Sequence, residues 1–122
     1  MSIIRSKGFF WLASRMKFVG EWSQAGSQIG ARPVGLWWAA LPKERLPRDK
    51  ANREYIMARW QEPYGDRRQE IVFIGVDVDK EALIRALDKC LLTDEEMLLG
   101  EERWKLFPDP FPRWTSTPAA NE

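Results

Sequence analysis

The spacing of apolar and polar residues in the first third of the chain predicts three strands. Residues 8–14 are aromatic or apolar at both alternating positions, which is typical of a central strand covered on both faces. Residues 17–34 predict a β-hairpin, because two strand-like arms flank a tight turn at Ala25 and Gly26. We expect Trp22 on the buried face of this hairpin.

Two later apolar runs extend the predicted sheet. Pro33 cannot donate a ladder hydrogen bond, so the second hairpin arm should lie near an edge or be bulged there, before residues 36–41 continue it. Residues 70–76 are almost all apolar and β-branched, which predicts a second central strand buried on both faces.

Three segments with helical spacing each follow a residue that can cap a helix: Asp49, Asp79 and Thr93. Thr93 is followed three residues later by Glu96, which matches a capping box, and Gly100 can close that short helix. The second helix should cover the sheet with an apolar face made of Leu83, Ala86, Leu87, Cys90 and Leu91.

Strand, hairpin, helix, strand and helix in this order predict an α+β fold, with a mainly antiparallel sheet of four to five strands and two to three helices packed on one face. The proline-rich run at residues 107–112 suits neither a helix nor a central strand. We expect one domain over residues 4–113 and a disordered tail over residues 114–122.

The net charge of +1 hides an uneven distribution. Residues 1–60 carry 11 Lys and Arg against 4 Asp and Glu, whereas residues 61–122 carry 8 against 14. The two halves either neutralise one another as solvated faces or leave a basic face for an acidic partner. No stretch approaches the length of a membrane span or a signal peptide, so we expect a cytoplasmic protein.

Few residues could carry catalysis or bind a metal. The chain has no histidine and a single cysteine, Cys90, which its apolar helix face predicts to be a core residue. Carboxylates near Asp77 and at residues 94–96 have a structural explanation at helix starts. No Gly-x-x-x-x-Gly-Lys-Ser/Thr loop occurs to hold nucleotide phosphates. We therefore predict no catalytic residue, no metal ligand and no cofactor.

The candidate interaction residues are basic, aromatic or amide side chains beside the predicted strands: Arg5, Lys7, Trp11, Trp22, Arg67, Arg68 and Gln69. The arginines before residue 70 either pair with Asp66 and Glu70 to fix the start of the strand, or bind an acidic partner surface or the phosphates of a nucleotide held by another domain.

Five segments of the chain, in order, resemble the C-terminal domain of CobW-type GTPases. They are Arg5-Ser6-Lys7-Gly8-Phe9-Phe10-Trp11-Leu12-Ala13, Trp22-Ser23-Gln24-Ala25-Gly26, Gly65-Asp66-Arg67-Arg68-Gln69-Glu70-Ile71-Val72-Phe73-Ile74-Gly75, Cys90-Leu91-Leu92-Thr93-Asp94-Glu95-Glu96 and Phe107-Pro108-Asp109-Pro110-Phe111. The resemblance covers residues 4–113 and implies a small α+β domain that follows a P-loop GTPase domain in proteins that deliver zinc or cobalt to client metalloenzymes.

That resemblance implies a regulatory or protein-interaction domain, whose partners are the CobW-type GTPase domain and a client metalloprotein. The family's GTPase motifs and its Cys-x-Cys-Cys metal site have no counterpart here, so the chain is either an excised part of a larger protein or a free-standing one. The alternative is a module that binds single-stranded nucleic acid through strand aromatics and basic residues of its first half.

Overall fold

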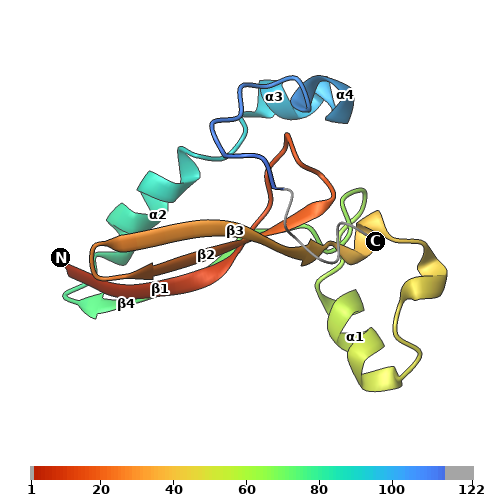
Figure 1. Cartoon of the computed structure of the whole chain (residues 1–122), viewed down its shortest axis with the longest axis horizontal. Helices are drawn as coiled ribbons and strands as arrows, with labels where there is room; N and C mark the ends of the chain where they lie inside the picture. Colours follow the sequence, from red (N-terminus) through yellow and green to blue (C-terminus); the bar gives the residue numbers. More distant parts are fainter. Residues whose placement is uncertain (1, 115–122) are drawn as a thin grey trace.

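The computed structural model describes residues 2–114, in which four antiparallel strands form one sheet of order β3-β2-β1-β4 (Figure 1). The strands are β1 (Ser2–Phe10), β2 (Phe18–Ala25), β3 (Gln28–Leu36) and β4 (Glu70–Val76). The helices are α1 (Lys50–Ala58), α2 (Lys80–Asp88), α3 (Asp94–Leu99) and α4 (Glu101–Trp104), with 3-10 turns at Trp38–Ala40 and Lys43–Arg45. The predicted α+β class and antiparallel sheet are confirmed.

The first strand is central, as predicted, but it lies earlier in the chain, and the prediction that it is covered on both faces is wrong, since Arg5, Lys7 and Phe9 are exposed on one of them. It pairs with β2 on one side and with β4 on the other, and it ends at Phe10. Residues 11–16 leave the sheet because the chain turns there, with the amide of Arg15 bonded to the carbonyl of Leu12 at 2.9 Å. An aromatic run does not distinguish a strand from a packed loop, which explains the error in the bounds.

The hairpin is confirmed, with β2 and β3 joined at Gly26, whose φ of 59° suits glycine. The prediction for Pro33 is also confirmed, because β3 is an edge strand and its register shifts where Gly20 pairs with Pro33. Continuation of this strand over residues 36–41 is wrong. The strand ends at Leu36, and the buried carboxylate of Asp66 accepts hydrogen bonds from the amides of Trp38 and Ala39, which start a 3-10 turn instead.

One face of the sheet is covered. Phe10 is buried on this face, where its ring lies against Gly20 and stacks on Phe111 at 5.9 Å. Toward the other end, Trp22 is half-buried against Phe73 and donates from Nε1 to the hydroxyl of Ser6 at 2.7 Å. Because paired residues point to the same side, these rings share one layer.

The prediction that residues 70–76 form a central strand buried on both faces is wrong. β4 is an edge strand, and its alternate residues Val72, Ile74 and Val76 are 64%, 60% and 55% exposed. The other alternate set, Ile71 and Phe73, is half-buried. An apolar run predicts that both faces of a strand pack against something. It does not show whether the packing partner belongs to the same chain or to another protein.

The helix caps were predicted correctly. The carboxylates of Asp49 and Asp79 accept from backbone amides at the starts of α1 and α2, and Thr93 with Glu96 forms the capping box of α3. Gly100, at φ 80°, ends α3. The predicted core position of Cys90 is wrong, because α2 ends at Asp88 and Cys90 lies exposed beyond it.

In Figure 1, α2 lies above the strands near the N-terminus, α3 and α4 lie beyond it, and α1 extends below the other end of the sheet. The side chain of Val78, just before α2, lies near Gly75 on the side of the sheet that Phe73 shares. The residues after α4 run without helix or strand to Trp114, as predicted. The expected disordered tail lies outside the described residues, except for Trp114.

We predict that Gly20→Ala destabilises the fold by about 1 to 3 kcal/mol, because an added Cβ at residue 20 would lie 2.5 Å from the ring of Phe10. The matched control is Gly30→Ala in the neighbouring strand, where no atom lies within 4 Å of an added Cβ. Urea unfolding followed by tryptophan fluorescence measures both. An equal effect of the two substitutions would contradict the packing described for Phe10.

Candidate interaction surface

Three of the predicted interaction residues form contacts within the fold that fix the loop of residues 11–17. The side-chain amide of Gln69 accepts from the backbone N–H of Trp11 at 3.0 Å and donates to its carbonyl at 3.1 Å, at the place where β1 and β4 cease to pair. Arg67 donates to the carbonyl of Met16 at 2.7 Å. Trp11 donates from Nε1 to the sulfur of Met16. These side chains hold the loop in place.

The same loop carries an aromatic cluster. The ring of Trp11 lies 5.2 Å from that of Tyr64 and 6.4 Å from that of Trp104, which is fully buried. Trp104 also donates from Nε1 to the carbonyl of Glu96 at 2.7 Å, so it joins α3 and α4 to the loop. This cluster extends the core beyond the sheet.

Arg68 and Glu70 form an ion pair at 3.2 Å, as the structural interpretation predicted. Its other half, pairing of the Asp66 side chain with an arginine, is wrong, because that carboxylate accepts from the backbone amides of Trp38 and Ala39. Arg68 donates instead to the backbone carbonyl of Asp66 at 3.0 Å. This segment therefore forms hydrogen bonds with its own fold.

Arg5 and Lys7 lie differently. Both are exposed on β1, on the sheet face opposite Phe10. The register places Arg5 beside Ile74 and Lys7 beside Val72. These two cations and the exposed valines and isoleucine of β4 therefore form one surface, which we call the open face.

An open hollow of about 350 Å³ adjoins this face where α1 meets the sheet. Its walls are largely apolar but include the charged residues Arg59, Asp66 and Arg68. The other lining residues are Phe9, Val19, Val34, Gly35, Leu36, Trp37, Trp38, Tyr55 and Ile56. Trp37 is 3% exposed, and its Nε1 has no hydrogen-bond partner. The hollow suits an apolar side chain better than a polar substrate.

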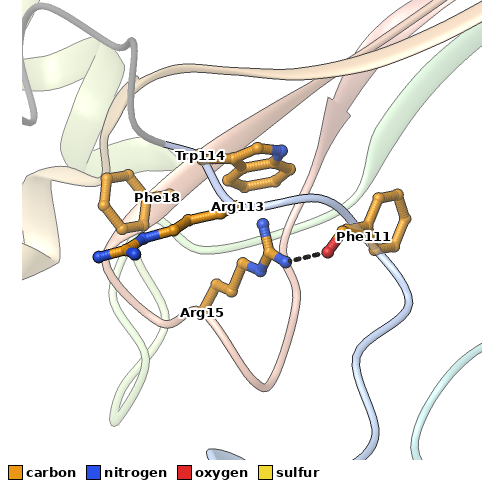
Figure 2. Close-up of a pocket in the computed structure, with 5 residues that line it drawn as sticks. All are labelled: Arg15, Phe18, Phe111, Arg113 and Trp114. Atoms are coloured by element: carbon orange, nitrogen blue, oxygen red, sulfur yellow. Dashed lines mark hydrogen bonds between the residues drawn. The ribbon is translucent and has the colours of Figure 1, made fainter.

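A second hollow, of about 370 Å³, lies between the loop and the C-terminal segment (Figure 2). Figure 2 shows Arg15 below the ring of Trp114, with the cation 4.5 Å from the ring centre, and Arg113 pointing away from it. Arg15 donates to both carboxylate oxygens of Asp109, at 2.7 and 2.9 Å, and to the carbonyls of Phe111 and Pro112. These contacts occupy the guanidinium of Arg15, and Arg113 points away from it (Figure 2). The two arginines therefore do not together form a binding site for an anion.

Asp109 is the acceptor that holds the segment against the loop. Partial burial alone would raise the pKa of Asp109, but hydrogen bonds from Arg15, Ser14 and the amide of Phe111 outweigh it and lower that pKa below its ordinary value of 3.8. Because Arg15 and Ser14 lie 94 and 95 residues from Asp109 in the chain, nothing in the local sequence marked the ion pair of Arg15 with Asp109.

The described residues contain no cluster of three or more potential metal-binding side chains and no helix long and apolar enough to cross a membrane. Of the aromatics of the first half considered for stacking on nucleic acid bases, Phe10 and Trp37 are buried, Trp11 packs on Tyr64 and Trp104, and Trp22 packs on Phe73, whereas Phe9 is 39% exposed. Sequence reasoning missed the exposed valines and isoleucine of β4. The available signal was that residues 70–76 need cover on two faces, while one amphipathic helix follows them.

Comparison with known proteins points to one family. Residues 1–91 match the model described as the cobalamin synthesis protein cobW C-terminal domain. The chain is 44% identical over 109 residues to zinc-regulated GTPase metalloprotein activator 1 of Dictyostelium discoideum, an alignment that covers 88% of this chain and 23% of the relative. It is 30% identical over 117 residues to a zinc chaperone of Mycobacterium tuberculosis, covering 95% of this chain and 29% of that protein.

The chain therefore spans about a quarter of the length of these curated relatives. No solved structure matches it. The comparisons thus relate this chain to one part of longer proteins.

We predict that Asp109→Asn lowers the free energy of unfolding by about 1 to 3 kcal/mol, because Arg15 loses its charged acceptor in a half-buried site. Glu21→Gln is the control. It weakens the ion pair with Arg32, whose side chain is largely exposed, and should change stability by less than about 0.5 kcal/mol.

The difference between the wild type and Asp109→Asn should also depend on pH. Since folding lowers the pKa of Asp109, its stabilising effect is complete above the unfolded-state pKa of about 3.9 and disappears as the pH falls through the lower folded-state pKa. Urea unfolding at pH 7, 4 and 3 measures this. A difference that stays constant down to pH 3 would refute the role of the carboxylate.

Proposed function

This chain belongs to the CobW C-terminal domain family, and on that premise we propose that it is an interaction and regulatory domain of a GTP-dependent metal chaperone. In this proposal it binds the GTPase portion of such a protein and helps to present it to a client metalloprotein. The observation that carries the proposal is the open face, where apolar side chains and two cations are exposed on a rigid sheet.

The names of the relatives support this assignment. One is called a zinc-regulated GTPase metalloprotein activator and the other a zinc chaperone, whereas the family description refers to cobalamin synthesis, which involves cobalt. We propose that the system served by this chain delivers zinc or cobalt, with zinc favoured because both relatives are named for it. The client is then an enzyme or other protein that needs this metal.

We assign nucleotide hydrolysis and metal capture to the GTPase portion and not to this chain. In support, the sequence carries no phosphate-binding Gly-x-x-x-x-Gly-Lys-Ser/Thr loop and no histidine, and its polar cluster at residues 66–69 is held by internal hydrogen bonds. We propose the cytoplasm as the place of this function, since GTP is available there.

An exposed apolar surface of this kind fits contact with a partner. Monomeric proteins rarely leave a continuous patch of valine and isoleucine in water, and such patches mark interaction sites. Domain interfaces within one chain resemble transient protein interfaces, with a modest affinity when the two parts are separated. We therefore expect binding that is measurable with separate domains and strengthened by covalent linkage.

Isothermal titration of the chain into the GTPase portion of the Dictyostelium relative tests the proposal. We expect saturable binding near one to one, with an affinity that differs between the GDP-loaded and GTP-analogue-loaded forms. A regulatory domain must distinguish these states, since a ligand with equal affinity for both shifts neither.

The control titrates the chain into a P-loop GTPase from outside this family, which should give no saturable heat. Absence of binding to the relative in either nucleotide state would refute the proposed function. Equal affinity in both states would leave an interaction domain without a regulatory role.

A further inference from the structure

The exposed residues of β4 form a continuous stripe along one edge of the sheet. Val72, Ile74 and Val76 point to the same side, since side chains alternate along a strand. Their neighbours on β1, Lys7 and Arg5, form a cationic ridge parallel to them. These are the five residues of the open face, and we call them the β4 stripe where their line along the edge matters.

We infer that the β4 stripe is the surface on which the GTPase portion of a CobW-type chain docks. The inference rests on the proposed function and deepens it by naming the surface. The surface on the GTPase portion should be apolar where it faces the valines and isoleucine, and acidic where it faces Arg5 and Lys7.

The two edges of the sheet differ in a way that supports this. An exposed edge strand usually carries proline, a bulge or charged residues that prevent other strands from pairing with it. The β3 edge has Pro33, a register shift and Arg32. The β4 edge has no proline, and its only charged residue is Glu70 at the first position. Its pairing with β1 also shifts register, but the extra residue, Ile4, lies in β1 and not in the edge strand. Such an edge is expected to be covered in the working protein.

The connection of the chain favours the GTPase portion as the occupant. The matched family is a C-terminal domain, so in longer relatives the preceding polypeptide enters at β1. Ser2 at the start of β1 pairs with Val76, at one end of the stripe. A segment tethered there is held at high effective concentration beside this surface, which promotes its binding over that of free partners.

The cationic ridge disfavours a second copy of this chain on the same face. Two copies packed with their β1 strands opposed would bring the Arg5 and Lys7 ridges close to each other, and like charges at an interface weaken binding. An acidic surface avoids this repulsion and gives both cations a counter-charge.

Footprinting with a carbene or hydroxyl-radical label tests the placement. The protein to use is a chimera in which this chain replaces the matching C-terminal region of the Dictyostelium relative. We expect labelling of Val72, Ile74 and Val76 to fall severalfold in the chimera compared with the separate chain. Ile29, which is 66% exposed on the other sheet face, should label equally in both.

Protection at another surface of the chimera, with β4 labelled as in the separate chain, would overturn the inference while leaving the proposed function intact. Protection of β4 in the separate chain that disappears on dilution would also overturn it, because the stripe would then bind a second copy.

A matched pair of substitutions gives an independent test by titration into the GTPase portion. Ile74→Glu places a negative charge in the stripe and should weaken binding about tenfold or more. Ile29→Glu makes the same change at a similarly exposed position of the other edge strand and should alter affinity less than about twofold. Circular dichroism checks that both variants fold.

Equal affinity of the Ile74→Glu and Ile29→Glu variants, with normal binding by the unchanged chain, would refute the stripe as the docking surface. No binding by the unchanged chain would refute the proposed function itself. The two failures are therefore distinguished by the same set of titrations.

Discussion

The structure depends on the hydrogen bonds that Arg67 and Gln69 make to the backbone of the loop after β1. These two side chains come from the segment before β4, so they join the two ends of the neighbouring strands where ladder pairing stops. Buried or half-buried backbone groups need partners, and here long side chains supply them in place of a strand. The loop is thereby fixed as a rigid part of the core.

Much of the remaining structure is attached to that fixed loop. The ring of Trp11 packs against Tyr64 and Trp104, and Trp104 positions α3 and α4. Arg15 binds Asp109, and this ion pair holds the C-terminal segment over Phe10. All of this packing lies on the covered side of the sheet or at its end. The opposite side keeps Arg5, Lys7 and the outward residues of β4 exposed.

This division separates the polar segment before β4, which binds to its own fold, from the exposed apolar strand. Arginine and glutamine in the motif before β4 are engaged by backbone carbonyls and amides, whereas the simple apolar alternation of β4 forms the part that faces outward. A domain whose polar groups are bound internally and whose exposed strand is apolar is suited to contact another protein surface, and less to chemistry on a small substrate.

The sequence by itself determined the elements that local interactions specify. Hairpin, helix starts and capping box were correct because Gly26, Asp49, Asp79 and Thr93 act on atoms a few residues away. Only the tertiary structure decided that β4 lies at an edge, that Asp66 stops β3 by binding amides 27 and 28 residues earlier, and that Cys90 is exposed. Each of these features depends on which distant segment packs against a residue. The hydrophobicity of a segment predicts that it will be buried, but it does not identify the segment that buries it.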